Sequence, residues 1–503
     1  MDWSGNTWRD LELGVTLDWN DALIDWSGAE EALAPAFAAM MALERGAIAN
    51  SDEGRMVGHY WLRMPEIAPS GLGAEIVRVR ELCRDIARDV HREGHHRSLL
   101  LLGIGGSALG PQLVADALAE PDDPLRVLCI DNTDPEGIAR LVGPLDLEQT
   151  LVLCISKSGG TAETRNALAE VQAAYARAEV PFAPNAIAVS GEGSKLWQAA
   201  AGWRARVPMW DWVGGRTSLF SAVGLLPAAL QGIDIDALVA GAASMDAHTR
   251  TSRLETNPAA RLAWAWYRLG RAERPRAMVV LPYRDRLVLF SRYLQQLVME
   301  SLGKALDRAG REVHEGLAVY GNKGSTDQHA YVQQLRDGPD DHFVTFIVAL
   351  DDGYHGQEEV EPGVVSGDYL QGFYLGTRRA LAESRHPSLS LTLATVDAFR
   401  LGALLALYER AVGLYAELVN VNAYHQPGVE AGKKAASVVI AMKPRLLAAL
   451  GEEPRPVDEI CAAAGLRDLA AAHALLSRLA ANDAGVVLHA GEAPAADRFA
   501  RSG

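Results

Sequence analysis

Two short stretches of the chain carry the residue types that proton transfer requires. Glu300 lies in Met299-Glu300-Ser301-Leu302-Gly303-Lys304, and His329 lies in Ser325-Thr326-Asp327-Gln328-His329-Ala330. A partly desolvated carboxylate and a histidine near neutral pKa can both give and take protons. On periodicity alone, the simpler interpretation of Glu300 is a helix-edge carboxylate paired with Lys304, and a lone histidine in a polar turn is usually exposed. The wider pattern must decide between these interpretations.

A hydroxyl-rich turn follows the apolar run Thr150–Ile155. Four hydroxyl residues surround its two glycines, at the mouth of an expected helix: Ser156, Ser158, Thr161 and Thr164. Hydroxyls, free backbone N–H groups and a helix dipole together form an anion site. A turn that only caps the helix is the alternative. The positive charge of Lys157 inside the turn favours phosphate binding over capping alone.

A second Gly-rich turn, Gly103-Ile104-Gly105-Gly106-Ser107, follows the leucine run that begins at Ser98. This is the pattern of a buried strand that feeds a helix through a tight turn. Open parallel sheets bind ligands at the carboxyl ends of their strands, so Gly106 and Ser107 are expected to share one crevice with the hydroxyl-rich turn.

The elements that position these turns form two series. Short apolar runs at 125–130, 150–155 and 186–189 indicate parallel strands buried on both faces. A second series contains an expected strand at 277–281, a long helix at 287–308 and a strand at 342–350, after a helical connection at about 237–271. The predicted fold class is therefore α/β, with two parallel-sheet α-β-α sandwiches.

Four parts are predicted along the chain, listed here by residue number: an N-terminal helical arm (1–75), a first α/β domain (76–245), a second α/β domain with C-terminal helices (246–450), and a small winged-helix-like appendage (451–503). The appendage is expected from the shift to prolines after residue 451, followed by two short amphipathic helices and a strand-like run.

Composition limits the partners. The formal charge of −16 over 503 residues disfavours nucleic acid and anionic membranes, so an anionic substrate needs a local cluster of donors. The four cysteines form no Cys-x-x-Cys pair, and no export signal or membrane span is expected, which favours a reduced, cytoplasmic protein. The adjacent His95 and His96 point to different sides of a helix and give no metal-ligand spacing, so no metal is expected.

Six motifs follow one another in the order of a known family. They are Gly103–Ser107, Ser156–Thr161, Val213-Gly214-Gly215-Arg216, Met299–Lys304, Ser325–Ala330 and Gln426-Pro427-Gly428-Val429-Glu430-Ala431-Gly432-Lys433. Together they resemble the glucose-6-phosphate isomerase family over roughly Leu99 to Lys433. The resemblance implies two sugar-isomerase-type (SIS-type) domains and an aldose–ketose isomerase that interconverts glucose 6-phosphate and fructose 6-phosphate without cofactor.

The resemblance also implies roles for single residues. Glu300 would be the base that moves a proton between adjacent carbons through a cis-enediol, and Arg216 would stabilise the negative enediolate. His329, assisted by Lys433, would open the sugar ring, and Gln426 would help to position the phosphate held by the two Gly-rich turns. A homodimer is implied, with His329 donated across the interface.

Two positions depart from the family pattern: Thr217 stands where an aromatic residue is common, and His425 where an acidic or amide residue is usual. Two alternatives stay open. A dual phosphoglucose/phosphomannose isomerase would act on mannose 6-phosphate as well. A non-catalytic sugar-phosphate-binding regulator would need the hydroxyl-rich turn but not Glu300, Arg216, His329 and Lys433 together.

Overall fold

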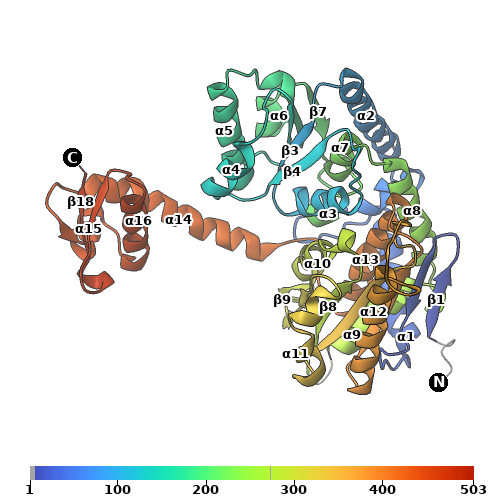
Figure 1. Cartoon of the computed structure of the whole chain (residues 1–503). Coiled ribbons are helices and arrows are strands. Elements are labelled where there is room, and N and C mark those ends of the chain that lie inside the picture. The colour runs from blue at the N-terminus through green and yellow to red at the C-terminus, as the bar shows by residue number, and fades with distance from the viewer. Residues whose placement is uncertain (1–5, 272–273, 503) are drawn as a thin grey trace. The chain divides into compact units, whose positions relative to one another are not determined.

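The computed structural model describes residues 6–271 and 274–502, and it contains two compact units, Met1–His425 and Gln426–Gly503 (Figure 1). The helices of the first unit are α1 Ala29–Glu44, α2 Leu72–Glu93, α3 Leu109–Ala117, α4 Pro135–Val142, α5 Ala162–Arg177, α6 Lys195–Ala199, α7 Ala222–Gln231, α8 Ile235–Thr249, α9 Pro258–Gly270, α10 Phe290–Leu294, α11 Val332–Asp337, α12 Ser366–Glu383 and α13 Ala398–Leu418.

The first sheet of this unit is entirely parallel. Its strands are β3 Ser98–Leu102, β4 Arg126–Ile130, β5 Thr150–Ile155, β6 Ala186–Ser190 and β7 Ala205–Pro208, in the order β4-β3-β5-β6-β7. Alternate residues of β3 face opposite sides: Leu99 packs with α2, α3 and α7, whereas Leu100 packs with α4, α5 and α6. Both faces are covered, which confirms the expected α/β sandwich and explains the continuous apolar strands.

The strand order places a topological switch point between β3 and β5. From β3 the chain moves outward to β4 on one side, and it then returns to continue from β5 on the other side. The connections that follow β3 and β5 therefore leave on opposite faces of the sheet and open a crevice at its carboxyl edge. The two Gly-rich turns predicted to bind phosphate begin at this edge.

The second sheet is mixed. Its order is β1-β2-β15-β12-β8-β11, with strands β1 Thr7–Asp10, β2 Val15–Asp18, β8 Ala277–Pro282, β11 Val319–Tyr320, β12 His342–Ala349 and β15 Ser388–Leu393. Strands β8, β11, β12 and β15 are parallel, whereas β1 and β2 form an antiparallel hairpin at one edge. The segment predicted as a helical arm thus also supplies two strands, and its alternating Val15 and Leu17 are buried against the common core.

The predicted long helix at 287–308 is wrong. The helical stretch is α10 followed by a π-helical turn, Gln295–Glu300, and it ends at Leu302. Lys304–Leu306 is instead strand β9, which pairs with β10, Glu312–Glu315. Asp307 turns the chain between them because its carboxylate accepts hydrogen bonds from the backbone N–H groups of Ala309 and Arg311.

The second unit has its own core. It consists of α14 Pro427–Ala449, β16 Arg455–Pro456, α15 Val457–Ala464, α16 Leu469–Ala481, β17 Val486–His489 and β18 Arg498–Arg501, with an antiparallel sheet in the order β16-β18-β17. Leu446, Ile460, Leu476 and Phe499 are buried together. The winged-helix-like character predicted for this part of the chain stays a prediction. The four domain boundaries drawn from the sequence stay predictions.

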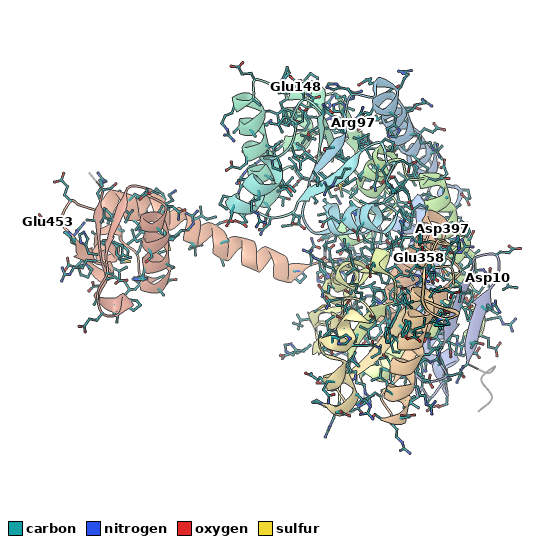
Figure 2. All side chains as sticks on the ribbon, in the orientation of Figure 1. Asp10, Arg97, Glu148, Glu358, Asp397 and Glu453 are labelled. Atoms are coloured by element: carbon teal, nitrogen blue, oxygen red, sulfur yellow. The ribbon has the colours of Figure 1, made fainter. Side chains whose placement is uncertain are left out.

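Side chains fill the spaces between the elements of each unit, and charged residues such as Glu148 and Glu453 are exposed (Figure 2). Within the described ranges no single helix has the length and apolar character of a membrane span. Only the bent pair α15 and α16 passes such a test jointly.

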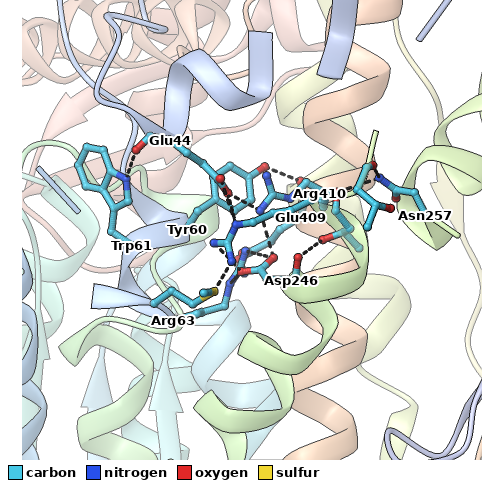
Figure 3. A network of polar contacts seen from close by, with 12 residues as sticks. Glu44, Tyr60, Trp61, Arg63, Asp246, Asn257, Glu409 and Arg410 are labelled. Carbon is cyan, nitrogen blue, oxygen red and sulfur yellow. Dashed lines mark hydrogen bonds and ion pairs between the residues drawn. The ribbon is translucent and has the colours of Figure 1, made fainter. Parts of the chain in front are cut away.

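A buried network of charges joins α1, α8 and α13 (Figure 3). Arg63 donates to both oxygens of Asp246, at 2.7 and 3.1 Å, and also to Glu409. Arg410 donates to Glu44 at 2.6 Å and to Asp246 at 3.3 Å. The side chains of Arg63, Asp246 and Glu409 are fully buried, so each charge depends on its partners instead of water.

Replacing Arg63 by methionine should lower the free energy of unfolding by about 3–5 kcal/mol, because the buried Glu409 would lose its cation and the buried Asp246 would lose its two bonds to Arg63 and keep the longer one to Arg410. Denaturant unfolding measures this. The control is Arg253→Met, since Arg253 and its partner Glu255 are exposed, and its effect should stay within about 0.5 kcal/mol. Equal effects of the two substitutions would contradict this view of the network.

Candidate active site

The centre of the candidate site is an ion pair between Arg216 and Glu300. Glu300 is the last residue of the π-helical turn, and Arg216 lies in the 3-10 turn Gly215–Thr217. The guanidinium Nε donates to Oε2 of Glu300 at 3.1 Å, with the side chains 5% and 21% exposed. Glu300 is therefore partly buried. The alternative pairing with Lys304 does not occur through the carboxylate, because Lys304 Nζ donates to the backbone carbonyl of Glu300 at 2.7 Å.

Arg216 is held on several sides. Its Nη1 donates to Ser301 Oγ at 3.4 Å and to the carbonyl oxygen of Ala423, and its Nη2 donates to the carbonyl oxygen of His425 at 3.3 Å. Burial lowers the pKa of Arg216, while the carboxylate of Glu300 acts in the opposite direction. The guanidinium is consequently a fixed positive charge beside Glu300.

The loop that supplies these carbonyls is braced by residues that the sequence did not single out. Asn422 donates to Asn50 Oδ1 at 3.0 Å and to the carboxylate of Asp52, and Asn50 donates to the carbonyl of Tyr424 at 3.3 Å. Burial lowers the pKa of His425, which stands where the family pattern has an acidic or amide residue. Its contact with Arg216 is through the backbone, so the side-chain change leaves that contact in place.

The first Gly-rich turn touches the arginine loop directly. A Cβ at Gly106 would overlap the carbonyl oxygen of Gly215, so only glycine allows the two backbones to approach so closely. A Cβ at Gly105 would lie 2.9 Å from Nε2 of Gln296, which places this amide at the same turn. Gln296 was missed in the sequence, although its place four residues before Glu300 on a helix is a usable signal. Ser107 ends this turn and is half-buried.

The serines of the hydroxyl-rich turn form hydrogen bonds within the turn, whereas its threonines differ. Ser156 Oγ accepts from Gly159 N at 3.2 Å, and Ser158 Oγ accepts from Gly160 N at 3.1 Å. Thr161 stands at the N-cap of α5, but its side chain makes no capping bond there. Thr164 is buried, and its Oγ1 has no hydrogen-bond partner among the described residues. Uncapped N–H groups and an unpartnered buried hydroxyl are features of an anion site.

Lys157 has protein partners. Its Nζ donates to the carbonyl oxygens of Asp211 and Val213, at 2.8 and 3.2 Å. Burial lowers the pKa of Lys157 to about 8. The ammonium therefore connects the hydroxyl-rich turn with the loop that leads to Arg216.

Three further predicted residues belong to other segments of the chain. His329 ends a 3-10 turn, Thr326–His329, and is exposed, without a hydrogen bond or ion pair to Glu300 or Arg216 in the part of the chain that is described. Gln426 is the exposed first residue of the second unit, and Lys433 lies in α14 outside the residues whose side chains are described. The turn before His329 contains Ser325 with a φ of 67°, a left-handed conformation that is uncommon for serine.

Among the described residues no group of three or more His, Cys, Asp or Glu side chains is arranged to hold a metal ion. The groups brought together are a carboxylate, a fixed guanidinium, and a turn of hydroxyls and backbone N–H groups. Such a set can bind an anionic ligand and exchange a proton next to a fixed positive charge.

The switch-point crevice, its two Gly-rich turns and the carboxylate–arginine pair define a two-sheet α/β enzyme that acts on an anionic substrate. Sequence comparison gives the family: the phosphoglucose isomerase model matches residues 29–372 and 373–447. The chain belongs to the phosphoglucose isomerase family.

Relatives and solved structures agree. A glucose-6-phosphate isomerase of Cyanothece sp. is 54% identical over 496 residues, covering 95% of this chain and 94% of the relative. One of Synechococcus sp. is 59% identical over 444 residues, covering 84% and 83%. The crystal structure of a glucose-6-phosphate isomerase from Chlamydia trachomatis has a TM-score of 0.80 at 26% identity, covering 88% of this chain and 91% of that one. The expected fold class is confirmed.

Replacing Gly106 by alanine should lower kcat/KM at least about 100-fold, because the new methyl group would overlap the Gly215 carbonyl and push the Gly215–Arg216 backbone out of position. Steady-state kinetics measures the loss. Gly202→Ala is the matched control, since a Cβ there meets nothing within 4 Å. Comparable activity of both variants would show that this close approach does not shape the site.

Proposed function

We propose that this chain interconverts glucose 6-phosphate and fructose 6-phosphate, with Glu300 as the base that moves the proton. The observation that carries the assignment is the Arg216–Glu300 pair at 3.1 Å, in a chain of the phosphoglucose isomerase family. Aldose–ketose interconversion removes a proton from the carbon beside a carbonyl and returns it to the neighbouring carbon. One carboxylate on one face of a cis-enediol can perform both steps.

Arg216 supplies the charge that this reaction needs. Proton removal leaves negative charge on the enediolate oxygens, and a guanidinium that is already fixed by Glu300, Ser301 and backbone carbonyls requires little reorganisation when that charge forms. Burial strengthens this electrostatic stabilisation because nearby water is scarce. Thr217 in place of an aromatic residue is buried and donates from Oγ1 to the carbonyl of Gly214 at 3.4 Å, which supports the same loop.

The phosphate is proposed to bind at the two Gly-rich turns. The residues assigned to it are Gly106, Ser107, Ser156, Ser158, Thr161, Thr164 and Gln426. Lys157 was predicted to join them, but its ammonium donates to the carbonyls of Asp211 and Val213. Within the described residues, α5 begins without a side-chain cap and the Thr164 hydroxyl has no partner, and both features support this assignment. The position of both turns at the carboxyl edge of the first sheet supports it as well. The formal charge of −16 repels a phosphate ester over most of the surface, so binding depends on these local hydrogen-bond donors.

Ring opening is assigned to His329 with Lys433. The proposed assembly is a homodimer in which each subunit donates His329 to the site of its partner. The exposed His329, which makes no bond to Glu300 or Arg216 in the described residues, fits a role in a neighbouring subunit. A cytoplasmic location is proposed because Cys83, Cys129, Cys154 and Cys461 are all free thiols.

The variant Glu300→Gln should lose isomerisation by at least about 1,000-fold while it still binds sugar phosphate, because it keeps size and polarity but removes the base. The measurement is exchange of the C2 proton of the substrate with solvent, followed by NMR. Binding of a sugar-acid phosphate inhibitor is the control for an intact site. Exchange near the wild-type rate would show that another group is the base.

Shared sites can be tested by mixing two inactive variants, Glu300→Gln and His329→Ala. If His329 serves the partner subunit, each mixed dimer contains one intact site of two, so activity should recover to roughly a quarter of wild type on random reassociation of equal amounts. Native mass spectrometry shows subunit exchange. An inactive mixture with proven exchange would mean that His329 serves its own chain or does not take part in the reaction.

A further inference from the structure

The side chain of Lys157 does not fit a role as a simple phosphate ligand. Residue type and position place it in the hydroxyl-rich turn, yet its ammonium is turned toward the loop after β7. It donates to the carbonyl of Asp211 at 2.8 Å and to that of Val213 at 3.2 Å, and its side chain is only 28% exposed. Two of its three N–H donors are thereby directed at one short segment.

That segment leads directly into the catalytic arginine. Val213 is followed by Gly214 and Gly215, so the two residues before Arg216 have no side chains with which to anchor the loop. The Asp211 carbonyl also accepts a bond from Arg55 Nη1 at 2.7 Å, so two cations converge on this part of the backbone. Charge-assisted bonds of this kind are stronger than bonds between neutral groups.

The other end of Lys157 is equally fixed. Its carbonyl accepts a bond from Gly191 N at 3.0 Å, and Ser190 Oγ contacts the same carbonyl at 3.4 Å. Ser190 is the last residue of β6 and Gly191 follows it, so these bonds attach the Lys157 backbone to the first sheet. Lys157 therefore connects the carboxyl end of β6 with residues 211–213 through its backbone carbonyl at one end and its ammonium at the other.

We infer that Lys157 is a positioning residue that joins the phosphate turn to the Arg216 loop, so that the placement of the arginine depends on the ammonium of Lys157. This inference rests on the proposed roles of the turn and of Arg216. Its kinetic signature differs from that of a phosphate ligand. A phosphate contact persists in the ground and transition states and so affects KM, whereas a displaced arginine weakens the transition state alone and so affects kcat.

The experiment compares Lys157→Met with Lys195→Met. Lys195 is the exposed first residue of α6 at the same edge of the sheet, so it controls for loss of one positive charge near the site. For each variant we would measure kcat, KM, the inhibition constant of inorganic phosphate, and hydrogen exchange of the peptide spanning residues 209–217. The double variant Ser156→Ala/Thr161→Ala provides the pattern of a lost phosphate contact.

For Lys157→Met we expect kcat to fall about 10- to 100-fold with KM and phosphate inhibition within about 2-fold of wild type. Hydrogen exchange at 209–217 should become faster, and Lys195→Met should match wild type in every measurement. A raised KM and weakened phosphate inhibition at unchanged kcat would overturn the inference and make Lys157 a phosphate ligand. Unchanged kinetics and exchange would overturn it as well.

Two further comparisons distinguish a failure of this inference from a failure of the proposed phosphate turn or of folding. If Ser156→Ala/Thr161→Ala leaves KM unchanged, the proposed phosphate turn itself is wrong, whatever Lys157 does. If Lys157→Met does not fold, as judged by circular dichroism, Lys157→Gln replaces it. The amide keeps a donor but loses the charge and length, so it should show the same fall in kcat with faster exchange at 209–217, and wild-type values would overturn the inference.

Discussion

The placement of one buried guanidinium determines much of this structure. The side chain of Arg216 is 5% exposed, and a buried charge of this kind is stable only if its N–H groups have acceptors. The acceptors come from distant parts of the chain: the carboxylate of Glu300, the hydroxyl of Ser301 and the carbonyls of Ala423 and His425. The segments around 216, 300 and 423 must therefore fold together before the site exists. The same contacts that satisfy the charge also fix the geometry in which it acts.

The surrounding elements limit how far this arrangement can relax. One apolar core runs through both sheets of the first unit, and it includes Leu99 of the first sheet and Val280 of the second. The separate network of Arg63, Asp246, Glu409 and Arg410 joins α8 and α13 inside the same unit (Figure 3). A buried ion network contributes little net stability against an apolar alternative, but loss of one member is strongly unfavourable. Packings that separate the members of this network would leave a buried charge unpaired, so they are disfavoured in the first unit.

The helix predicted at 287–308 shows where a local pattern stops being sufficient. Apolar residues at helical spacing continue as far as Leu302, so the pattern is correct for the segment that carries Glu300. It contains no signal for the π-helical turn Gln295–Glu300, and the change to strand β9 depends on pairing with Glu312–Glu315. The hairpin β1–β2 is similar, because Val15–Asp18 becomes a strand by pairing with β15. Strand pairing between remote segments cannot be predicted from the periodicity of either segment alone.

By itself, the sequence determined strands β3, β4, β5 and β6 of the first sheet, though not β7, together with the two Gly-rich turns and the family to which the six motifs belong. These features depend on neighbours within a few residues: apolar runs, glycines that permit tight turns, and hydroxyls at the start of a helix. Tertiary structure decided which groups meet. It directed Lys157 toward Asp211 and Val213, brought Gly106 against Gly215, and braced the 422–425 loop with Asn50 and Asp52. Arg216 and Glu300 are separated by 84 positions, and only the packing of two sheets around one core brings their charges to 3.1 Å.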